Sequence, residues 1–295
     1  ATPDDPSDDD APAINAALQA AADFIDSVQV GIEVDWPNYG NQVYQQLVYL
    51  PAGTYHLETA VVFPASMAYP ERWGRKERFI WLHGAGEKET ILELKSANEI
   101  GVFGHDTLPK PIVQVVQYDP ETYQGNDNFQ LFVTDLSIQS PADQPHAIGL
   151  SYGVSNIGAA RNLTIKAAGE GGKVGFAFVQ RNTGPGIVES VTVEGFDKGV
   201  EIIDPWGEVF TFKDIMVRNQ NAGGIGLSVA DKQIGLENFT SEQDEPDVTP
   251  ILLHDDDYFN TEHGGAPHLT LINATLISAI ETEKPAVVIE KGHIY

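Results

Sequence analysis

The stretch Asn162-Leu163-Thr164-Ile165 decides the fold, because its order of turn-forming, apolar, hydroxyl and apolar residues recurs along the chain. The other segments built on this order are Asp135-Leu136-Ser137-Ile138, Ser190-Val191-Thr192-Val193, Asp214-Ile215-Met216-Val217, Asn238-Phe239-Thr240-Ser241 and Asn273-Ala274-Thr275-Leu276. Their first residues are separated by 27, 28, 24, 24 and 35 positions. A period in this range is typical of a solenoid.

A second apolar segment recurs between these copies. Its examples are Ala147-Ile148-Gly149-Leu150, Gly175-Phe176-Ala177-Phe178, Gly199-Val200-Glu201-Ile202, Gly224-Ile225-Gly226-Leu227 and Ala286-Val287-Val288-Ile289. Each coil therefore has about three short strands, and inward side chains stack on those of the next coil at a spacing of about 4.8 Å. The pattern predicts an all-β, single-stranded, right-handed parallel β-helix. One inner column should contain Leu163, Val191, Ile215 and Phe239.

The first residue of each copy is expected at a sharp corner between two strands. Asn and Asp tolerate the left-handed backbone conformation that such a corner needs, and stacked amides can hydrogen-bond from coil to coil. The sequence therefore predicts an asparagine-type ladder. Asn162, Asn238 and Asn273 also begin N-glycosylation patterns, but all three occupy the same repeat position, which favours a structural role.

The N-terminal segment predicts a helix that caps the solenoid. Aspartates at positions 8–10 can cap a helix over residues 11–25, whose apolar stripe contains Ile14, Leu18, Ala21 and Ile25. An open solenoid end would expose core and strand edges, so a cap is required there. We expect one domain over residues 1–295, with the cap in residues 1–30 and the coils in residues 47–295.

The two ends of the sequence lead to further expectations. Residues 1–10 are small and acidic, as in a mature chain after signal removal, so we expect a secreted protein. No second cap follows the repeat strand at residues 286–290. A second β-helix domain or self-association is therefore expected to cover the C-terminal end.

The charge of the chain excludes several partners. The net charge is −26, from 17 basic and 43 acidic residues, so nucleic acids and anionic membrane surfaces would be repelled. No apolar run is long enough to span a membrane. The chain contains no cysteine, which removes disulfides and thiolate metal sites. A neutral polysaccharide or oligosaccharide is not repelled.

Three N-terminal motifs resemble those of the pectate-lyase-like superfamily. They are Asp9-Asp10-Ala11-Pro12-Ala13-Ile14-Asn15-Ala16-Ala17-Leu18, Val48-Tyr49-Leu50-Pro51-Ala52-Gly53-Thr54-Tyr55, and Leu82-His83-Gly84-Ala85-Gly86 with Thr90. The superfamily includes rhamnogalacturonase-like and epimerase-like proteins and the family 55 glycoside hydrolases, which act on β-1,3-glucan. The stretch at residues 184–197 is similar to bacterial members near that last branch. Family 55 enzymes have two β-helices with the catalytic glutamate on the second, and this chain resembles the first, so no catalytic residue is carried over.

A charged row is predicted on the outward face, four residues after each corner. Its members are Gln139, Lys166, Glu194, Arg218 and Glu242. Opposite charges on neighbouring strands stabilise a sheet by roughly 0.2–1 kcal/mol per pair, which favours a structural role. The same row can hold a sugar chain, with Arg218 as a binding residue and Glu242 as a catalytic one.

One turn combines two carboxylates with an indole. Asp204 and Glu208 flank Trp206. Glycoside hydrolysis needs a carboxylic acid and a carboxylate, about 5 Å apart for retention and about 6.5–9.5 Å apart for inversion. An indole supplies an apolar platform for a sugar ring. Alternatively, Pro205 and Gly207 shape the turn and Trp206 packs on the solenoid.

The longest excursion between coils spans residues 253–263. Asp255, Asp256 and Asp257 offer oxygen ligands for calcium, although the EF-hand pattern is absent, and Tyr258 is a candidate for substrate contact. Solvated loop charge is the alternative. Calcium is thus a possible cofactor, and hydrolysis requires none.

Three functional classes follow from these features. The first is a glycoside hydrolase acting on a polysaccharide such as a β-1,3-glucan, and net acidity favours it because a neutral ligand is not repelled. The second is a lyase acting on a uronate polymer, which needs a base and a metal ion or arginine for the substrate carboxylate. The third is a non-catalytic carbohydrate-binding half of a larger enzyme.

Overall fold

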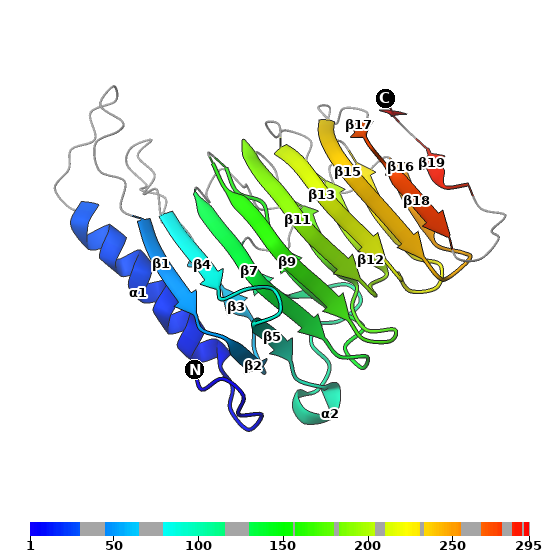
Figure 1. Ribbon diagram of the computed structural model, residues 1–295. Coiled ribbons are helices and arrows are strands. Elements are labelled where there is room, and N and C mark those ends of the chain that lie inside the picture. Colours follow the sequence, from blue (N-terminus) through cyan, green and yellow to red (C-terminus); the bar gives the residue numbers. More distant parts are fainter. Residues whose placement is uncertain are drawn as a thin grey trace.

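The computed structural model describes residues 1–29, 45–64, 79–115, 130–155, 157–179, 183–203, 210–230, 233–254, 267–278, 285–290 and 292–294. The described strands form two sheets. In Figure 1 they follow one another from blue to red, with the helix α1 (Ala11–Gln29) beside the first strands. A short helix, α2 (Ala97–Ile100), follows the fifth strand.

Every strand pairing in both sheets is parallel. The 12-stranded sheet contains β1 (Gln45–Leu50), β2 (Gly53–Leu57), β4 (Phe79–Gly84), β5 (Thr90–Leu94), β7 (Leu131–Ser140), β9 (Ala159–Ala167), β11 (Gly186–Glu194), β13 (Phe210–Arg218), β15 (Gln233–Gln243), β17 (His268–Ile272), β18 (Thr275–Ser278) and β20 (His293–Ile294). The 8-stranded sheet contains β3 (Val61–Val62), β6 (Lys110–Gln114), β8 (Ala147–Ser151), β10 (Val174–Val179), β12 (Lys198–Ile203), β14 (Ile225–Ala230), β16 (Thr249–His254) and β19 (Val287–Ile289). The predicted parallel β-helix with an N-terminal capping helix is confirmed.

The predicted corners are confirmed by the backbone. All six first residues of the repeat have a positive φ, between 51° and 60°: Asp135, Asn162, Ser190, Asp214, Asn238 and Asn273. Most of these corners lie inside a single long strand, such as β9 or β11. The first two short strands predicted for each coil are therefore one bent strand.

Amide side chains join several corners into the predicted ladder. Asn162 Nδ2 donates to Asp135 Oδ1 at 2.8 Å, and Asn238 Nδ2 donates to Asp214 Oδ1 at 2.7 Å. Asn273 Nδ2 in turn donates to Asn238 Oδ1 at 3.2 Å. The structural role predicted for these asparagines is confirmed.

The inner column predicted from the repeat is also confirmed. Leu163, Val191, Ile215 and Phe239 are in register on β9, β11, β13 and β15, and all four are buried. Burying a side chain of this size stabilises the fold by about 1.5–3 kcal/mol. Because such columns continue from strand to strand, the core extends along the stack, and the outer faces of the sheets become long, regular surfaces.

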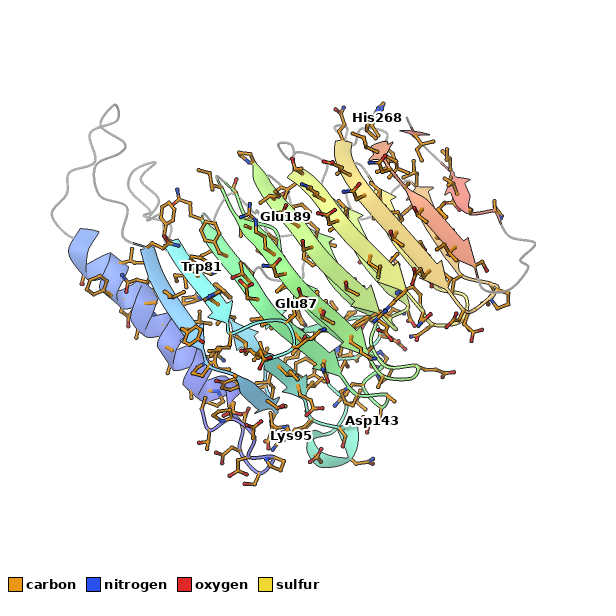
Figure 2. The ribbon with its side chains drawn as sticks, viewed as in Figure 1. Trp81, Glu87, Lys95, Asp143, Glu189 and His268 are labelled. Carbon is orange, nitrogen blue, oxygen red and sulfur yellow. The ribbon has the colours of Figure 1, made fainter. Side chains whose placement is uncertain are left out.

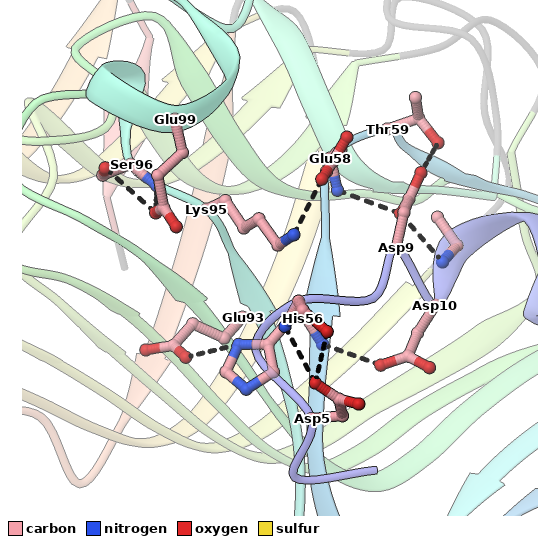
Figure 3. A network of polar contacts seen from close by, with 12 residues as sticks. Asp5, Asp9, Asp10, His56, Glu58, Thr59, Glu93, Lys95, Ser96 and Glu99 are labelled. Carbon is pink, nitrogen blue, oxygen red and sulfur yellow. Dashed lines mark hydrogen bonds and ion pairs between the residues drawn. The ribbon is translucent and has the colours of Figure 1, made fainter. Parts of the chain in front are cut away.

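The capping helix is longer than predicted, and its apolar stripe is buried against the first coils. Asp9 accepts a hydrogen bond from the backbone of Ala11 at 3.2 Å. The carboxylate of Asp10 instead accepts from the backbone N–H group of Thr2 at 2.7 Å and from that of His56 at 2.9 Å. Figure 3 shows the contact with His56. Of the three aspartates predicted to cap the helix, Asp9 is thus the one whose side chain accepts from its first turn.

The first ten residues form an N-terminal arm along β2. The Asp4 N–H donates to the carbonyl oxygen of Thr54 at 2.7 Å, and the Thr54 N–H donates to the carboxylate of Asp4 at 2.9 Å. Glu58 N–H donates to Asp9 Oδ1 at 3.0 Å. These aspartates satisfy donors of a strand edge that would otherwise be open.

Burial falls toward the last strands. Leu269 on β17 is fully buried, whereas Ile272, Ile277 and Ile289 are exposed. Coverage of this end by a second domain or a second copy stays a prediction, as does the assignment of residues 1–295 to one domain. No described helix is both long and apolar enough to cross a membrane.

Candidate functional site

The outward side chains of the 12-stranded sheet fall into rows, because side chains alternate about each corner. One row lies one residue before the corners and contains Thr134, Arg161, Glu189, Lys213 and Glu237. A second row lies four residues after the corners and contains Gln139, Lys166, Glu194, Arg218 and Glu242. Strands β9 and β13 thus present cations, and β11 and β15 present carboxylates.

Ion pairs link these strands across both rows. A glutamate on β11 lies between a cation on β9 and a cation on β13 in each row. The distances are 3.4 Å from Arg161 Nε to Glu189 Oε2, 3.8 Å from Lys213 Nζ to Glu189 Oε1, 3.2 Å from Lys166 Nζ to Glu194 Oε1 and 2.8 Å from Arg218 Nη2 to Glu194 Oε2. The predicted alternation of charge is confirmed for the second row.

The cations extend further into solvent than the carboxylates that they pair with. The exposed fraction of the side chain is 46% for Arg161 and 47% for Lys166, against 29% for Glu189 and 16% for Glu194. On a chain of net charge −26, this part of the sheet therefore offers positive groups at its surface.

A hollow of about 350 Å³ lies at the N-terminal side of these rows. It crosses β4, β7, β9 and β11, and Figure 2 shows Trp81 and Glu189 on this face of the sheet. The lining residues are Gln45, Trp81, Phe132, Thr134, Asp135, Ile157, Gly158, Ala159, Arg161, Asn162 and Ile187. The hollow combines aromatic rings, a carboxylate, an amide and a guanidinium.

Aromatic rings make up one side of the hollow. The ring centroid of Trp81 lies 6.2 Å from that of Phe132 and 5.1 Å from that of His83. Tyr49, half exposed on β1, lies 5.8 Å from His83. Adjacent strands thus carry a run of rings, which is the kind of surface on which sugar faces stack.

A compact polar network holds the carboxylate of the hollow. Asp135 Oδ1 accepts from Asn162 Nδ2 at 2.8 Å, and Asp135 Oδ2 lies 3.1 Å from His83 Nδ1. Thr134 Oγ1 accepts from Trp81 Nε1 at 2.7 Å and lies 2.8 Å from His83 Nδ1. The network therefore joins the indole, the imidazole and the carboxylate.

A second carboxylate lies nearby. Thr134 is in register with Arg161, and Arg161 with Glu189, so the backbones of Asp135 and Glu189 are separated by about two strand spacings, or about 10 Å. Carboxyl groups about 6.5–9.5 Å apart suit inverting glycoside hydrolysis, with room for water between them.

The site residues predicted from the sequence lie partly elsewhere. Arg218 is on β13 in an ion pair with Glu194, and Glu242 follows on β15, so both are beyond the lining of the hollow. The other predicted residues fall outside the described ones, and their roles stay predictions: Asp204, Trp206, Glu208, Asp255, Asp256, Asp257 and Tyr258. Among the residues that the structure does describe, no group of three or more His, Asp or Glu side chains is arranged to hold a metal ion.

The sequence also contains a second row of alternating charges, which includes Arg161 of the hollow and was not predicted. Arg161, Glu189, Lys213 and Glu237 stand one position before their corners, and their alternating signs match those of the row that was recognised. Trp81 gave no comparable signal, because β4 precedes the regular repeat.

Comparison with known proteins identifies a family and several structures of similar architecture. The family model described as "Rhamnogalacturonase A/epimerase, pectate lyase-like" matches residues 1–245. No curated protein gives a significant match.

Three solved structures illustrate the structural similarity. ORF18 of Geobacillus virus E2 has a TM-score of 0.49 and 14% identity over 92% of this chain and 47% of its own. Tailspike protein 2 of Escherichia coli O157:H7 bacteriophage CAB120 has a TM-score of 0.38 and 7% identity over 92% and 44%. The A-module of the Azotobacter vinelandii mannuronan C-5 epimerase AlgE6 has a TM-score of 0.30 and 12% identity over 97% and 96%. The chain spans about half the length of the first two proteins.

Proposed function

The chain belongs to the rhamnogalacturonase A/epimerase, pectate lyase-like family, and from this premise we propose that it hydrolyses a polysaccharide held across the strands of its 12-stranded sheet. The observation that carries the proposal is the hollow on β4 to β11, where an indole platform adjoins Asp135 and Arg161. An extracellular location is part of the proposal, because a polymer of this kind is met outside the cell.

In the proposed reaction, Asp135 is the base and Glu189 the acid. Both oxygens of Asp135 contact neighbouring side chains, at 2.8 and 3.1 Å, which hold the carboxylate in place to accept a proton from water. Glu189 lies between Arg161 and Lys213, at 3.4 and 3.8 Å, and acts as the acid when it is protonated. The water oxygen attacks the anomeric carbon as Asp135 takes its proton. The glycosidic C–O bond breaks, and Glu189 protonates the leaving oxygen.

A neutral glucan, such as a β-1,3-glucan, is the substrate class proposed first. The net charge of −26 does not repel it, and the rings of Trp81 and Phe132 suit sugar faces.

A uronate polymer is the second candidate, and elimination would be the reaction. The observation that favours it is the outward position of the cations: Arg161 and Lys166 are each almost half exposed and extend beyond their glutamates. Calcium at Asp255–Asp257 would belong to this alternative. A binding-only role, as half of a larger enzyme with a second β-helix, is the remaining possibility.

The decisive experiment incubates the protein with a neutral β-glucan and with a polyuronate, and then measures reducing ends and ultraviolet absorbance. Hydrolysis gives reducing ends without absorbance, whereas elimination gives absorbing unsaturated ends. Binding without either product supports the binding-only role.

The site is tested with Asp135→Asn and Glu189→Gln. Each should lower kcat at least about hundredfold, because each removes a group that transfers a proton in the reaction. Glu237→Gln is the matched control, since Glu237 occupies the same row two strands beyond Glu189 and should leave kcat unchanged. If both variants stay active while Asp204→Asn or Glu208→Gln loses turnover, the catalytic pair belongs to that turn instead.

A further inference from the structure

Thr134 lies at the centre of the polar network, and its surroundings fix the positions of protons. Its hydroxyl oxygen accepts from the indole N–H of Trp81, which can only donate. The same oxygen is 2.8 Å from His83 Nδ1, and that nitrogen is also 3.1 Å from Asp135 Oδ2. A single imidazole nitrogen therefore faces a hydroxyl and a carboxylate at hydrogen-bond distance.

With Asp135 ionised, only one arrangement of protons satisfies both contacts. If the Thr134 hydroxyl donated to a bare Nδ1, the lone pair of that nitrogen would also face the carboxylate of Asp135, which is repulsive. If Nδ1 carries the proton, it donates to both oxygens. The geometry therefore requires a proton on His83 Nδ1.

We propose that His83 is the positioning residue of the hollow, and that its Nδ1–H fixes the carboxylate of Asp135 and, through Thr134, the indole of Trp81. The role in turnover rests on the proposed function, whereas the proton assignment does not. The hydroxyl of Thr134 is shielded, since only 4% of the residue is exposed, so water is a poor substitute for these contacts.

The surroundings of His83 contain few other polar groups. On β1 it faces the ring of Tyr49, and on its own strand the ring of Trp81. On β7 it faces Thr134 and Asp135. The next charge in the row is Arg161 on β9, in register with Thr134. Asp135 is thus the anionic group in direct contact with the imidazole among the described residues.

The proton assignment is tested directly by ¹⁵N NMR of the histidine side chains in the intact protein, across the pH range in which imidazole titrates. We expect Nδ1 of His83 to carry a proton. A bare Nδ1 with a proton on Nε2 would overturn the inference, because Asp135 would then have to be the donor.

The positioning role is tested with an isosteric pair of variants. His83→Asn places an amide N–H near the position of Nδ1, whereas His83→Leu has a similar shape without a donor. We expect His83→Leu to lower kcat by about a hundredfold through misplacement of Asp135, and His83→Asn to recover at least about tenfold of that loss. Equal loss in both variants contradicts the role.

His56 supplies the control. Its Nδ1 lies 3.1 Å from Glu93 Oε2 on β5, the same distance as in the His83 contact, but far from the lining of the hollow. His56→Leu should leave kcat unchanged. The two hypotheses fail separately: a protein that binds but does not cut any glycan, with Nδ1 of His83 protonated, contradicts the hydrolase alone. An active hydrolase with a bare Nδ1 contradicts the positioning role alone.

Discussion

Tyr152 shows how strongly one side chain can tie stability to pH. The residue is fully buried, and its hydroxyl donates to the carbonyl oxygen of Leu131 at 3.0 Å. Burial raises the pKa of its phenol well above the ordinary value, because the charged form would lose its hydration. The folded chain therefore holds this proton more tightly than the unfolded chain does.

The consequence is a loss of stability in alkali. The contribution of Tyr152 is complete below the unfolded pKa of about 10 and declines as the pH rises further. Lys95, whose pKa is raised by its hydrogen bond to Glu58, loses its contribution in the same range. We therefore expect the free energy of unfolding, measured in urea, to fall as the pH rises above about 10.

The variant Tyr152→Phe separates the two effects. At pH 7 it should destabilise the protein by about 1–3 kcal/mol, because the Leu131 carbonyl loses its partner in a buried position. Above about pH 10 its decline should be shallower than that of the unchanged protein, because one titrating group is gone. An identical decline in both proteins would show that the phenol plays no part.

Single residues differ in how far the sequence reveals them. Asn162 was predictable because a preference for positive φ is a local property of its side chain. Asp135 was recognised only as a corner, because its contact with His83 joins two strands whose separation in sequence the repeat does not predict. The position of the Trp81 indole in the hollow was not predictable either, because it depends on the pairing of β4 with β7, where Trp81 is in register with Phe132.

At the level of elements, the ladder of corners has one gap. Ser190 has a φ of 56° but no side-chain amide, and it stands between Asn162 and Asp214. Asn adopts this backbone conformation more readily than Ser, and its side chain is long enough to reach a neighbouring corner. The fold is therefore less stable with Ser190 at this corner than it would be with an asparagine there.

The variant Ser190→Asn should stabilise the protein by about 1 kcal/mol. The gain comes from a relaxed corner and from a hydrogen bond to the Asp214 carboxylate or the Asn162 amide. Denaturant unfolding measures it, with Ser190→Ala as the control that removes the hydroxyl and adds no amide. A lower midpoint for Ser190→Asn than for Ser190→Ala would contradict the ladder as a source of stability.

The elements were predictable to the extent that their determinants are local. The helix at 11–25 follows from its stripe, and in the structure it continues to Gln29. The repeat revealed the corners but not that β9 and β11 continue through them, because the positive-φ residue bends the strand without ending its ladder of hydrogen bonds.

Over the whole molecule, burial is uneven from one end to the other. The arm at residues 1–10 and α1 cover the first coils, whereas β18 and β19 contain no fully buried residue. In a solenoid each coil contacts only its neighbours, so local stability follows the local burial. The two ends should therefore open with different free energies.

Hydrogen–deuterium exchange measures this difference. Amides of β17, β18 and β19 should exchange fastest among the described strands, and those of β9, β11 and β13 slowest, because the latter have buried columns on both sides. Uniform protection along the stack would contradict the nearest-neighbour description. Protection of β18 and β19 that rises with protein concentration would indicate that a second copy covers this end.

The aspartates that bind the N-terminal arm to β2 also make the two ends of the molecule differ in their resistance to force. Under tension between its two ends, rupture begins where the fewest bonds must break, at the side of β19, and travels toward the helix. Repeats of 24 to 35 residues then detach one at a time, each releasing roughly 80–120 Å of chain. In a single-molecule pulling experiment, a series of separate force peaks, one for each repeat, would show that the protein unfolds coil by coil from this end.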